Sequence, residues 1–176
     1  MRRRFVLPLL LVGLAAGVTL APLAASNRPD FRLPSLDGKS LGPADFRGKV
    51  VVLDFWATWC GPCHAQQSIL QKVHGQYAPG QVQFLAVDVG EDEKTVRAFV
   101  KERPFPFPVL LDEKESLTGK YGLVAFPTLM IVDTKGEVTY LRPGIVPEKR
   151  LRDLLEKAGA PAVPAPTPPA TKPAAR

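Results

Sequence analysis

The sequence is poor in the side chains that most often bind transition metals, with 2 cysteines and 2 histidines among its 176 residues. A zinc site would need two ligands besides the cysteines, and His64 and His74 do not supply them at a familiar spacing. A structural disulfide is the other simple explanation of the two cysteines. The surrounding sequence has to distinguish it from a reactive pair.

Net charge is also small over most of the chain. Residues 28–157 contain 18 Lys and Arg and all 17 Asp and Glu, although the whole chain has a formal charge of +6. The positive excess therefore lies in the two ends of the chain. A near-neutral domain without a basic stripe lacks the electrostatic footprint of a nucleic-acid-binding protein. We expect no nucleic-acid partner.

The most informative stretch is KVVVLDFWATWCGPCH, residues 49–64. Its first half, residues 50–56, is β-branched, aliphatic and aromatic, and Asp54 is its one polar member. This composition predicts a strand buried on both faces of a sheet. Its second half contains Cys60 and Cys63, and a helix-compatible run follows. The cysteines are therefore expected where a strand turns into a helix.

This junction favours reactive thiols over a structural disulfide. A cysteine at a helix N-terminus faces free N–H groups and the positive end of the helix dipole, which lowers a thiol pKa from about 8.5 to roughly 3.5 to 7.5. Cys60 is predicted at that position, and Cys63, one helical turn later, is within reach of it for a small disulfide ring. Pro62 suits the first turn of a helix, where its missing N–H costs nothing.

The segment WCGPC after VVLDFWAT resembles the active site of the thioredoxin superfamily, and residues 29–157 more closely resemble the TlpA/ResA-like thiol-disulfide oxidoreductases. The pattern F-x-L-x-x-L-D-G-K at residues 31–39 is similar to the N-terminal hairpin of that family, and VGED at residues 89–92 to the start of its central insertion. The resemblance implies an α/β protein with a thioredoxin fold. Such a fold has a central mixed sheet flanked by helices, here with an N-terminal β-hairpin and a central αβ insertion. It implies neither a metal nor another cofactor.

The hydrophobic pattern places the other elements of the domain, which we assign to residues 28–158. In chain order we expect a parallel strand at 82–89, a helix from about 91 that ends at Arg103-Pro104, a short strand within 105–111, a helical piece at 115–121, paired strands at 128–132 and 137–141, and a closing helix at 146–158.

Asp54 is expected to hold a proton near neutral pH, because burial in an apolar strand raises the pKa of a carboxyl group. Its position six residues before Cys60 matches the buried acid of thioredoxin, and the resemblance assigns it the deprotonation of Cys63. Many TlpA-like proteins instead have asparagine here and a glutamate three residues after the second cysteine, where this chain has Gln66. The structural alternative is an Asp at a strand end bonded to the backbone.

The family also implies roles for residues around the cysteines. Pro127 is expected to follow a cis peptide bond and to lie against the cysteine pair. The backbone of Phe126 would then pair with an extended substrate segment. Trp56 is predicted to shape the surface near the cysteines, and His64 either to raise the thiolate fraction or to face water. The substrate-binding surface is expected to include Trp59, Gly61 and Pro62.

Both ends of the chain look like appendages. Three arginines at positions 2–4 precede an uncharged apolar stretch at 5–25, the pattern of a signal peptide or an N-terminal membrane anchor within residues 1–27. Cleaved and anchored forms both fit this pattern, and both export the domain. Residues 159–176 are rich in Pro and Ala, which predicts a disordered tail.

The sequence therefore predicts an extracytoplasmic or periplasmic thiol-disulfide oxidoreductase that reduces disulfides of exported proteins. In the implied reaction Cys60 attacks the substrate disulfide and Cys63 resolves the mixed disulfide. An oxidising compartment would leave the pair oxidised after one turnover, which implies a membrane electron donor of the CcdA or DsbD type. The substrates that the family implies are apocytochrome c and the cysteines of a copper site.

The alternative function is that of a Sco-like copper metallochaperone, in which two cysteines and a distant histidine hold the metal. Here the cysteine spacing is C-x-x-C instead of C-x-x-x-C, and no histidine follows His74. Stoichiometric copper binding without turnover of a disulfide substrate would support this alternative.

Overall fold

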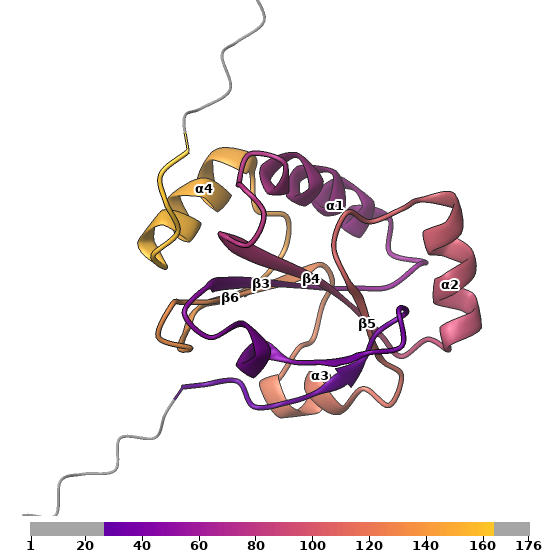
Figure 1. The fold of residues 1–176 in the computed structure, drawn as a ribbon. Coiled ribbons are helices and arrows are strands. Elements are labelled where there is room, and N and C mark those ends of the chain that lie inside the picture. Colours follow the sequence, from indigo (N-terminus) through magenta and orange to yellow (C-terminus); the bar gives the residue numbers. More distant parts are fainter. Residues whose placement is uncertain (1–26, 164–176) are drawn as a thin grey trace, which may run out of the picture.

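β3 (Val50–Trp56) is the central strand of a five-stranded sheet with the order β5-β4-β3-β6-β7 (Figure 1). Every residue of β3 is buried, as its apolar composition predicts. β4 (Val82–Val89) pairs with it in parallel and β6 (Thr128–Val132) antiparallel. β5 (Val109–Asp112) and β7 (Val138–Pro143) form the two edges. The predicted mixed sheet is confirmed.

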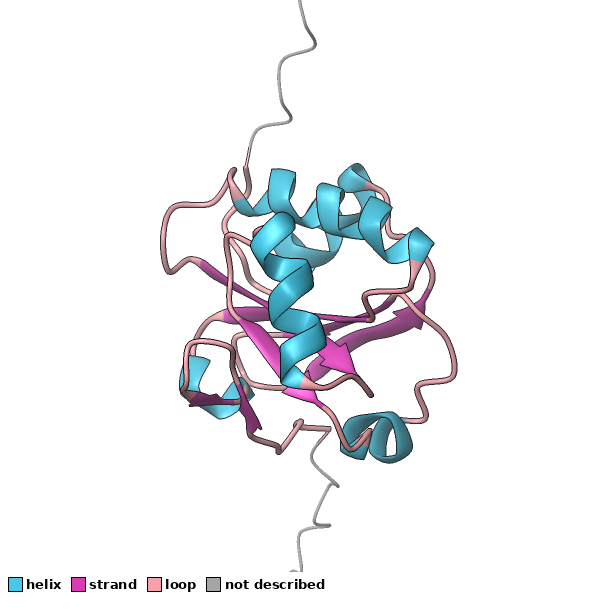
Figure 2. Cartoon of the chain, turned by 90° about the vertical axis from the view of Figure 1, so that its right-hand side faces the viewer, coloured by secondary structure: helices cyan, strands magenta, loops and turns pink. Residues whose placement is uncertain are grey.

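The computed structural model describes residues 27–163, and within them four α-helices cover both faces of the sheet (Figures 1 and 2). α1 (Gly61–His74), α2 (Glu93–Glu102) and α4 (Glu148–Lys157) bury apolar side chains in the core layer on one face. α3 (Ser116–Tyr121) contributes to the layer on the other face. The predicted helices are confirmed, with ends that differ by a few residues.

The predicted N-terminal hairpin is present as β1 (Leu33–Pro34) and β2 (Ser40–Leu41), which pair antiparallel. A bridge between Ser35 and Leu110 attaches it to the edge strand β5. This contact covers an edge that would otherwise present unpaired N–H and C=O groups. A 3-10 helix, Pro43–Phe46, then leads toward β3 and was not predicted.

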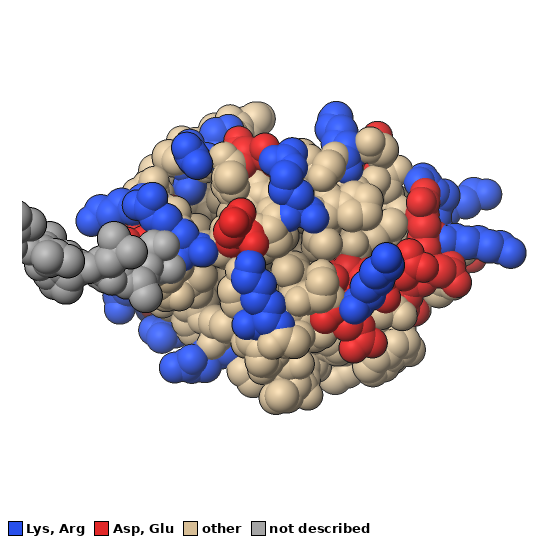
Figure 3. All heavy atoms as spheres, turned by 90° about the horizontal axis from the view of Figure 1, so that it is seen from below, with Lys and Arg blue, Asp and Glu red and all other residues tan. Residues whose placement is uncertain are grey.

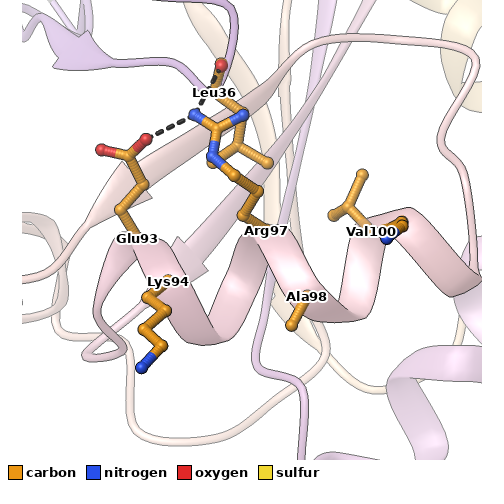
Figure 4. A pocket seen from close by; sticks show the side chains of 7 residues that line it. Leu36, Glu93, Lys94, Arg97, Ala98 and Val100 are labelled. Carbon is orange, nitrogen blue, oxygen red and sulfur yellow. Dashed lines mark hydrogen bonds and ion pairs between the residues drawn. The ribbon is translucent and has the colours of Figure 1, made fainter.

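Arg97 ties the hairpin to α2. Its Nη2 donates to the Leu36 carbonyl oxygen at 2.9 Å, and the same guanidinium pairs with Glu93 one turn earlier (Figure 4). These residues line a hollow together with Ala98 and Val100, and neither cysteine belongs to it. The hollow therefore marks the packing of the hairpin on α2 and is separate from the disulfide.

The packed part of the chain continues past the predicted boundary at residue 158. The N–H of Ala160 donates to the Leu155 carbonyl oxygen at 2.9 Å, Ala160 is buried, and Val163 packs against the core. The predicted signal or anchor segment, apart from Asn27, and the tail beyond residue 163 lie outside the described residues. Between residues 27 and 163 no helix is long and apolar enough to cross a bilayer.

Charges of both signs are mixed on the face seen in Figure 3. Lys and Arg side chains lie scattered among uncharged residues, and Asp and Glu gather toward one side (Figure 3). Several exposed charges form ion pairs, such as Arg32 with Asp45 at 2.8 Å and Lys149 with Asp153 at 3.0 Å. This face carries no continuous basic stripe, in agreement with the near-neutral charge of the domain.

We expect Gln66→Ala to lower the free energy of unfolding by about 1 to 3 kcal/mol, the range for an unpaired buried donor. Gln66 on α1 is fully buried, and its Oε1 accepts the Val146 N–H at 2.6 Å, so the substitution leaves that donor unpaired. Urea unfolding measures the change. Gln71→Ala on the exposed side of α1 is the control, with an expected change below about 0.5 kcal/mol. Equal effects of the two substitutions would contradict the prediction.

Candidate active site

Cys60 and Cys63 form a disulfide at the N-terminus of α1. Cys60 is the N-cap residue, and the Cys63 N–H points at its Sγ over 3.3 Å. Cys60 is 4% exposed and Cys63 0%, so only Cys60 reaches the surface. The helix end therefore presents an N–H group to the more accessible sulfur, the arrangement that stabilises a thiolate after reduction.

Asp54 is buried in the middle of the sheet. Its side chain lies on the same face of β3 as Val52 and Trp56, which pack in the layer that contains Cys63, because alternate strand residues share a face. Neither carboxyl oxygen has a hydrogen-bond partner, so the alternative of a backbone-bonded strand-end Asp is wrong. Burial raises the pKa of Asp54 to about 8, and the group is protonated at neutral pH.

A second buried carboxyl group, Asp88, was not predicted. It lies in β4 opposite Trp56 and is fully buried. Burial raises the pKa of Asp88 to about 8, with further contributions from a hydrogen bond and the negative charge of Glu91. The sequence does contain a signal for it, because VQFLAVDV at residues 82–89 repeats the pattern of one Asp in an apolar strand.

Thr58, two residues before Cys60, is held from two sides. Its N–H and its Oγ1 donate to the two carboxyl oxygens of Glu91 at 2.5 and 2.6 Å. Its carbonyl oxygen lies 3.2 Å from Nε2 of His64, whose Nδ1 is 3.1 Å from Nη1 of Arg103. Because a guanidinium only donates, Nδ1 accepts and Nε2 carries the proton. His64 therefore links α2 to the loop, a role that was not predicted.

An apolar surface lies beside the disulfide. Trp59 is 71% exposed, and its ring meets that of Phe126 edge-on at a centroid distance of 6.3 Å. Both rings line a hollow with the 91% exposed Val124 and residues of α3. The Phe126–Pro127 bond is cis, as the resemblance implied, and Pro127 is buried at the start of β6. The structure thus brings Trp59 and Phe126 together, 67 positions apart in the sequence.

The expectation for Trp56 is wrong. The side chain is fully buried, and its ring packs against Phe99 and Phe105 at centroid distances of 5.2 and 5.1 Å. Trp56 therefore joins β3 to α2 and to the segment after α2, and does not form the surface near the cysteines. Gln66 takes the place of the glutamate of many TlpA-like proteins. Its Oε1 accepts a hydrogen bond from the backbone N–H of Val146, just before α4.

A copper site would need a third ligand near the cysteines. His64 directly follows Cys63, but both of its ring nitrogens already have partners. In the part of the chain that the structure describes, no group of three or more His, Cys, Asp and Glu side chains is placed to hold a metal ion. No observation on these residues favours the copper-binding alternative.

Three features define a thioredoxin fold with a redox-active cysteine pair. They are a disulfide at the N-terminus of the helix that follows the central strand, a buried acid in that strand, and a cis-proline before the neighbouring strand. Residues 23–156 match the family model described as Redoxin, and the chain therefore belongs to the Redoxin family.

Relatives within this family carry the same chemistry in their names. The chain is 32% identical over 136 residues to the thiol-disulfide oxidoreductase ResA of Geobacillus thermodenitrificans, which covers 77% of this chain and 78% of that protein. A putative thiol:disulfide interchange protein DsbE from Chlorobium tepidum superposes with a TM-score of 0.69 at 30% identity, over 76% of this chain and 96% of that one. The exposed lipoprotein thioredoxin of Streptococcus pneumoniae gives 0.66 at 27%, over 73% and 99%. The protein is a TlpA/ResA-like thiol-disulfide oxidoreductase.

We expect Asp54→Asn to stabilise the protein at pH 7 by on the order of 4 kcal/mol. Between pH 3.8, where an ordinary Asp side chain titrates, and about pH 8, the unfolded chain has released a proton that the folded protein retains. The stability of the unsubstituted protein therefore falls as pH rises through this window, and the substitution removes the contribution of Asp54 to that slope. Urea unfolding of the oxidised protein between pH 4 and 9 measures it.

Asp30→Asn is the control for this experiment, because Asp30 is exposed. Its stability curve should run parallel to that of the unsubstituted protein over the whole pH range. A parallel curve for Asp54→Asn as well would show that Asp54 does not retain its proton on folding.

Proposed function

We propose that the protein is an extracytoplasmic reductase of disulfides in other exported proteins. The observation that carries the proposal is the pairing of a disulfide, of which only Cys60 reaches the surface, with the buried acid Asp54 behind it. Gly61 and Pro62 between the cysteines resemble the reducing members of the superfamily. The reaction needs no cofactor, because the two thiols carry both electrons.

The first step joins the protein to its substrate. The Cys60 thiolate attacks one sulfur of the substrate disulfide, forms a mixed disulfide and releases the other substrate sulfur as a thiolate. The N–H of Cys63 and the positive end of α1 stabilise the attacking thiolate. The fully buried Cys63 sulfur is protected from attack on other partners, which assigns it the second step.

In the second step Cys63 gives its proton to Asp54, which reacts in its ionised form in the reduced protein, and attacks the Cys60 sulfur. This restores the disulfide and releases the second substrate thiolate, so two electrons pass to the substrate. The pKa of Asp54, about 8, lies near the ordinary pKa of a thiol, about 8.5, so proton transfer between the two groups is nearly balanced. Asp54 is thus suited to take up the proton and to return it when the pair is reduced again.

The substrate would bind along the exposed surface beside Cys60. Trp59 and Phe126 offer apolar contacts, and Gly61 and Pro62 are exposed at the helix start. We assign to the backbone of Phe126, ahead of Pro127, the pairing with an extended substrate segment. Such contacts are tolerant of sequence, which suits an enzyme that acts on several proteins.

Residues 1–27 would export the domain as a signal peptide or hold it at the outer side of the membrane as an anchor. The likeness to a lipoprotein thioredoxin that is named as exposed supports this location. A membrane protein of the CcdA or DsbD type would return electrons to the cysteine pair, since an oxidising compartment does not. Apocytochrome c and the cysteines of a copper site are the substrates that the family resemblance implies.

We expect the Cys60–Cys63 pair of the purified protein to have a reduction potential near that of thioredoxin, about −270 mV. Equilibration with glutathione or dithiothreitol buffers measures it, because about 30 mV corresponds to a tenfold change in the equilibrium constant. A potential near that of DsbA, about −120 mV, would overturn the reductase assignment and make the protein an oxidant of folding proteins.

We expect Cys63→Ala to accumulate a mixed disulfide through Cys60 with a reducible substrate protein, and Cys60→Ala to accumulate none. In a chain that retains both cysteines, Asp54→Asn should prolong the same mixed disulfide, with resolution slowed about 10²-fold, the lower end of general acid-base effects. Non-reducing electrophoresis with mass spectrometry after acid quenching measures both. Trapping through Cys63 instead would reverse the assigned order of attack.

A further inference from the structure

The loop between β3 and α1 reaches the surface with Cys60 at its end, and Glu91 holds its middle. Both oxygens of the Glu91 carboxyl group accept hydrogen bonds from Thr58, one from the backbone N–H at 2.5 Å and one from Oγ1 at 2.6 Å. A group that only accepts, with both oxygens, has the hydrogen-bonding pattern of a carboxylate. Such bonds are shorter and stronger than neutral ones. Glu91 therefore restrains both the backbone and the side chain of Thr58.

Asp88, three residues before Glu91, is completely buried, and neither of its carboxyl oxygens has a hydrogen-bond partner. Burial raises the pKa of Asp88 to about 8, and the negative charge of Glu91 contributes to the same shift. Asp88 therefore keeps a proton at neutral pH, while the Glu91 carboxylate accepts its two bonds from Thr58.

We propose that Glu91 is a positioning residue that holds Thr58 and thereby presents Cys60 to the substrate disulfide. The proposal rests on the nucleophilic role assigned to Cys60 above. The Glu91 carboxylate bonds only to Thr58 in this scheme and acts on Cys60 through it.

The other charged and titratable groups near Glu91 and Thr58 come from several elements. Arg103 donates to Nδ1 of His64, and Nε2 of His64 donates to the carbonyl oxygen of Thr58. Arg103 therefore bonds to His64 and not to Glu91. The carboxyl oxygens of Asp112 accept bonds from the first turn of α3. The remaining such groups nearby are Asp54 on the same face of the sheet, Asp92 at the start of α2 and Glu115 beside Gly90.

The test compares Glu91→Gln with Glu93→Gln in the full-length protein in detergent micelles, where Glu93→Gln is a matched control whose side chain is exposed and pairs with Arg97. We expect Glu91→Gln to speed hydrogen exchange of the Thr58 amide at least tenfold and to slow the reaction of reduced Cys60 with a small disulfide at least fivefold. Glu93→Gln should change neither rate. Unchanged rates in Glu91→Gln would overturn the positioning role.

Substitutions at Thr58 keep the proposal testable if Glu91→Gln folds poorly. Thr58→Val removes only the Oγ1 donor and should slow Cys60, whereas Thr58→Ser keeps both donors and should restore the rate. Equal rates in the two variants would contradict the proposal. If Cys60 of the unsubstituted protein shows no exchange with disulfides, the proposed function fails. The hydrogen-exchange rate of the Thr58 amide still decides whether Glu91 restrains Thr58.

Discussion

The site depends on β3 being buried from end to end. A strand with paired neighbours on both sides and a packed layer on both faces cannot shift without breaking the whole sheet, so the loop after it starts from a fixed point. From that point three residues, 57–59, lead to the N-cap of α1, which is Cys60. The rigid strand and the helix N-terminus together determine where the Cys60 sulfur lies and which N–H groups it faces.

The segment around α2 adds a second constraint on the same loop. Glu91 precedes α2 and Arg103 follows it, and both act on Thr58, one directly and the other through His64. Between them Phe99 packs on the buried ring of Trp56, at the end of β3. The two ends of the α2 segment and its apolar face therefore all contact β3 or the loop that leads to the cysteines, directly or through His64.

Much of this arrangement could be predicted from the sequence. β3, β4 and β6 match their predicted residues because each is a mainly apolar, β-branched run between turn signals. The contacts between elements could not be predicted in this way. The surface position expected for Trp56 is wrong because periodicity does not show that α2 packs on it, and the hydrogen bonds of Glu91 and His64 join positions that only the fold brings together. The cis bond before Pro127 follows from the family resemblance, not from any local pattern.

The number of hydrogen-bond donors separates the buried acids into two kinds. The Asp112 carboxyl group accepts three hydrogen bonds from Ser116 and Leu117. These bonds compensate for its burial and satisfy N–H groups in the first turn of α3. Asp54 and Asp88 lie in adjacent strands on one face and receive no donor at all. A buried carboxyl group without donors destabilises the folded state unless it keeps a proton. Sequences depart from the usual rules of stability most often at functional sites. Here both exceptions lie on the face of the sheet whose core layer contains Cys60 and Cys63. The fold thus retains two protons beside a disulfide whose reduction and reoxidation must take up and release protons.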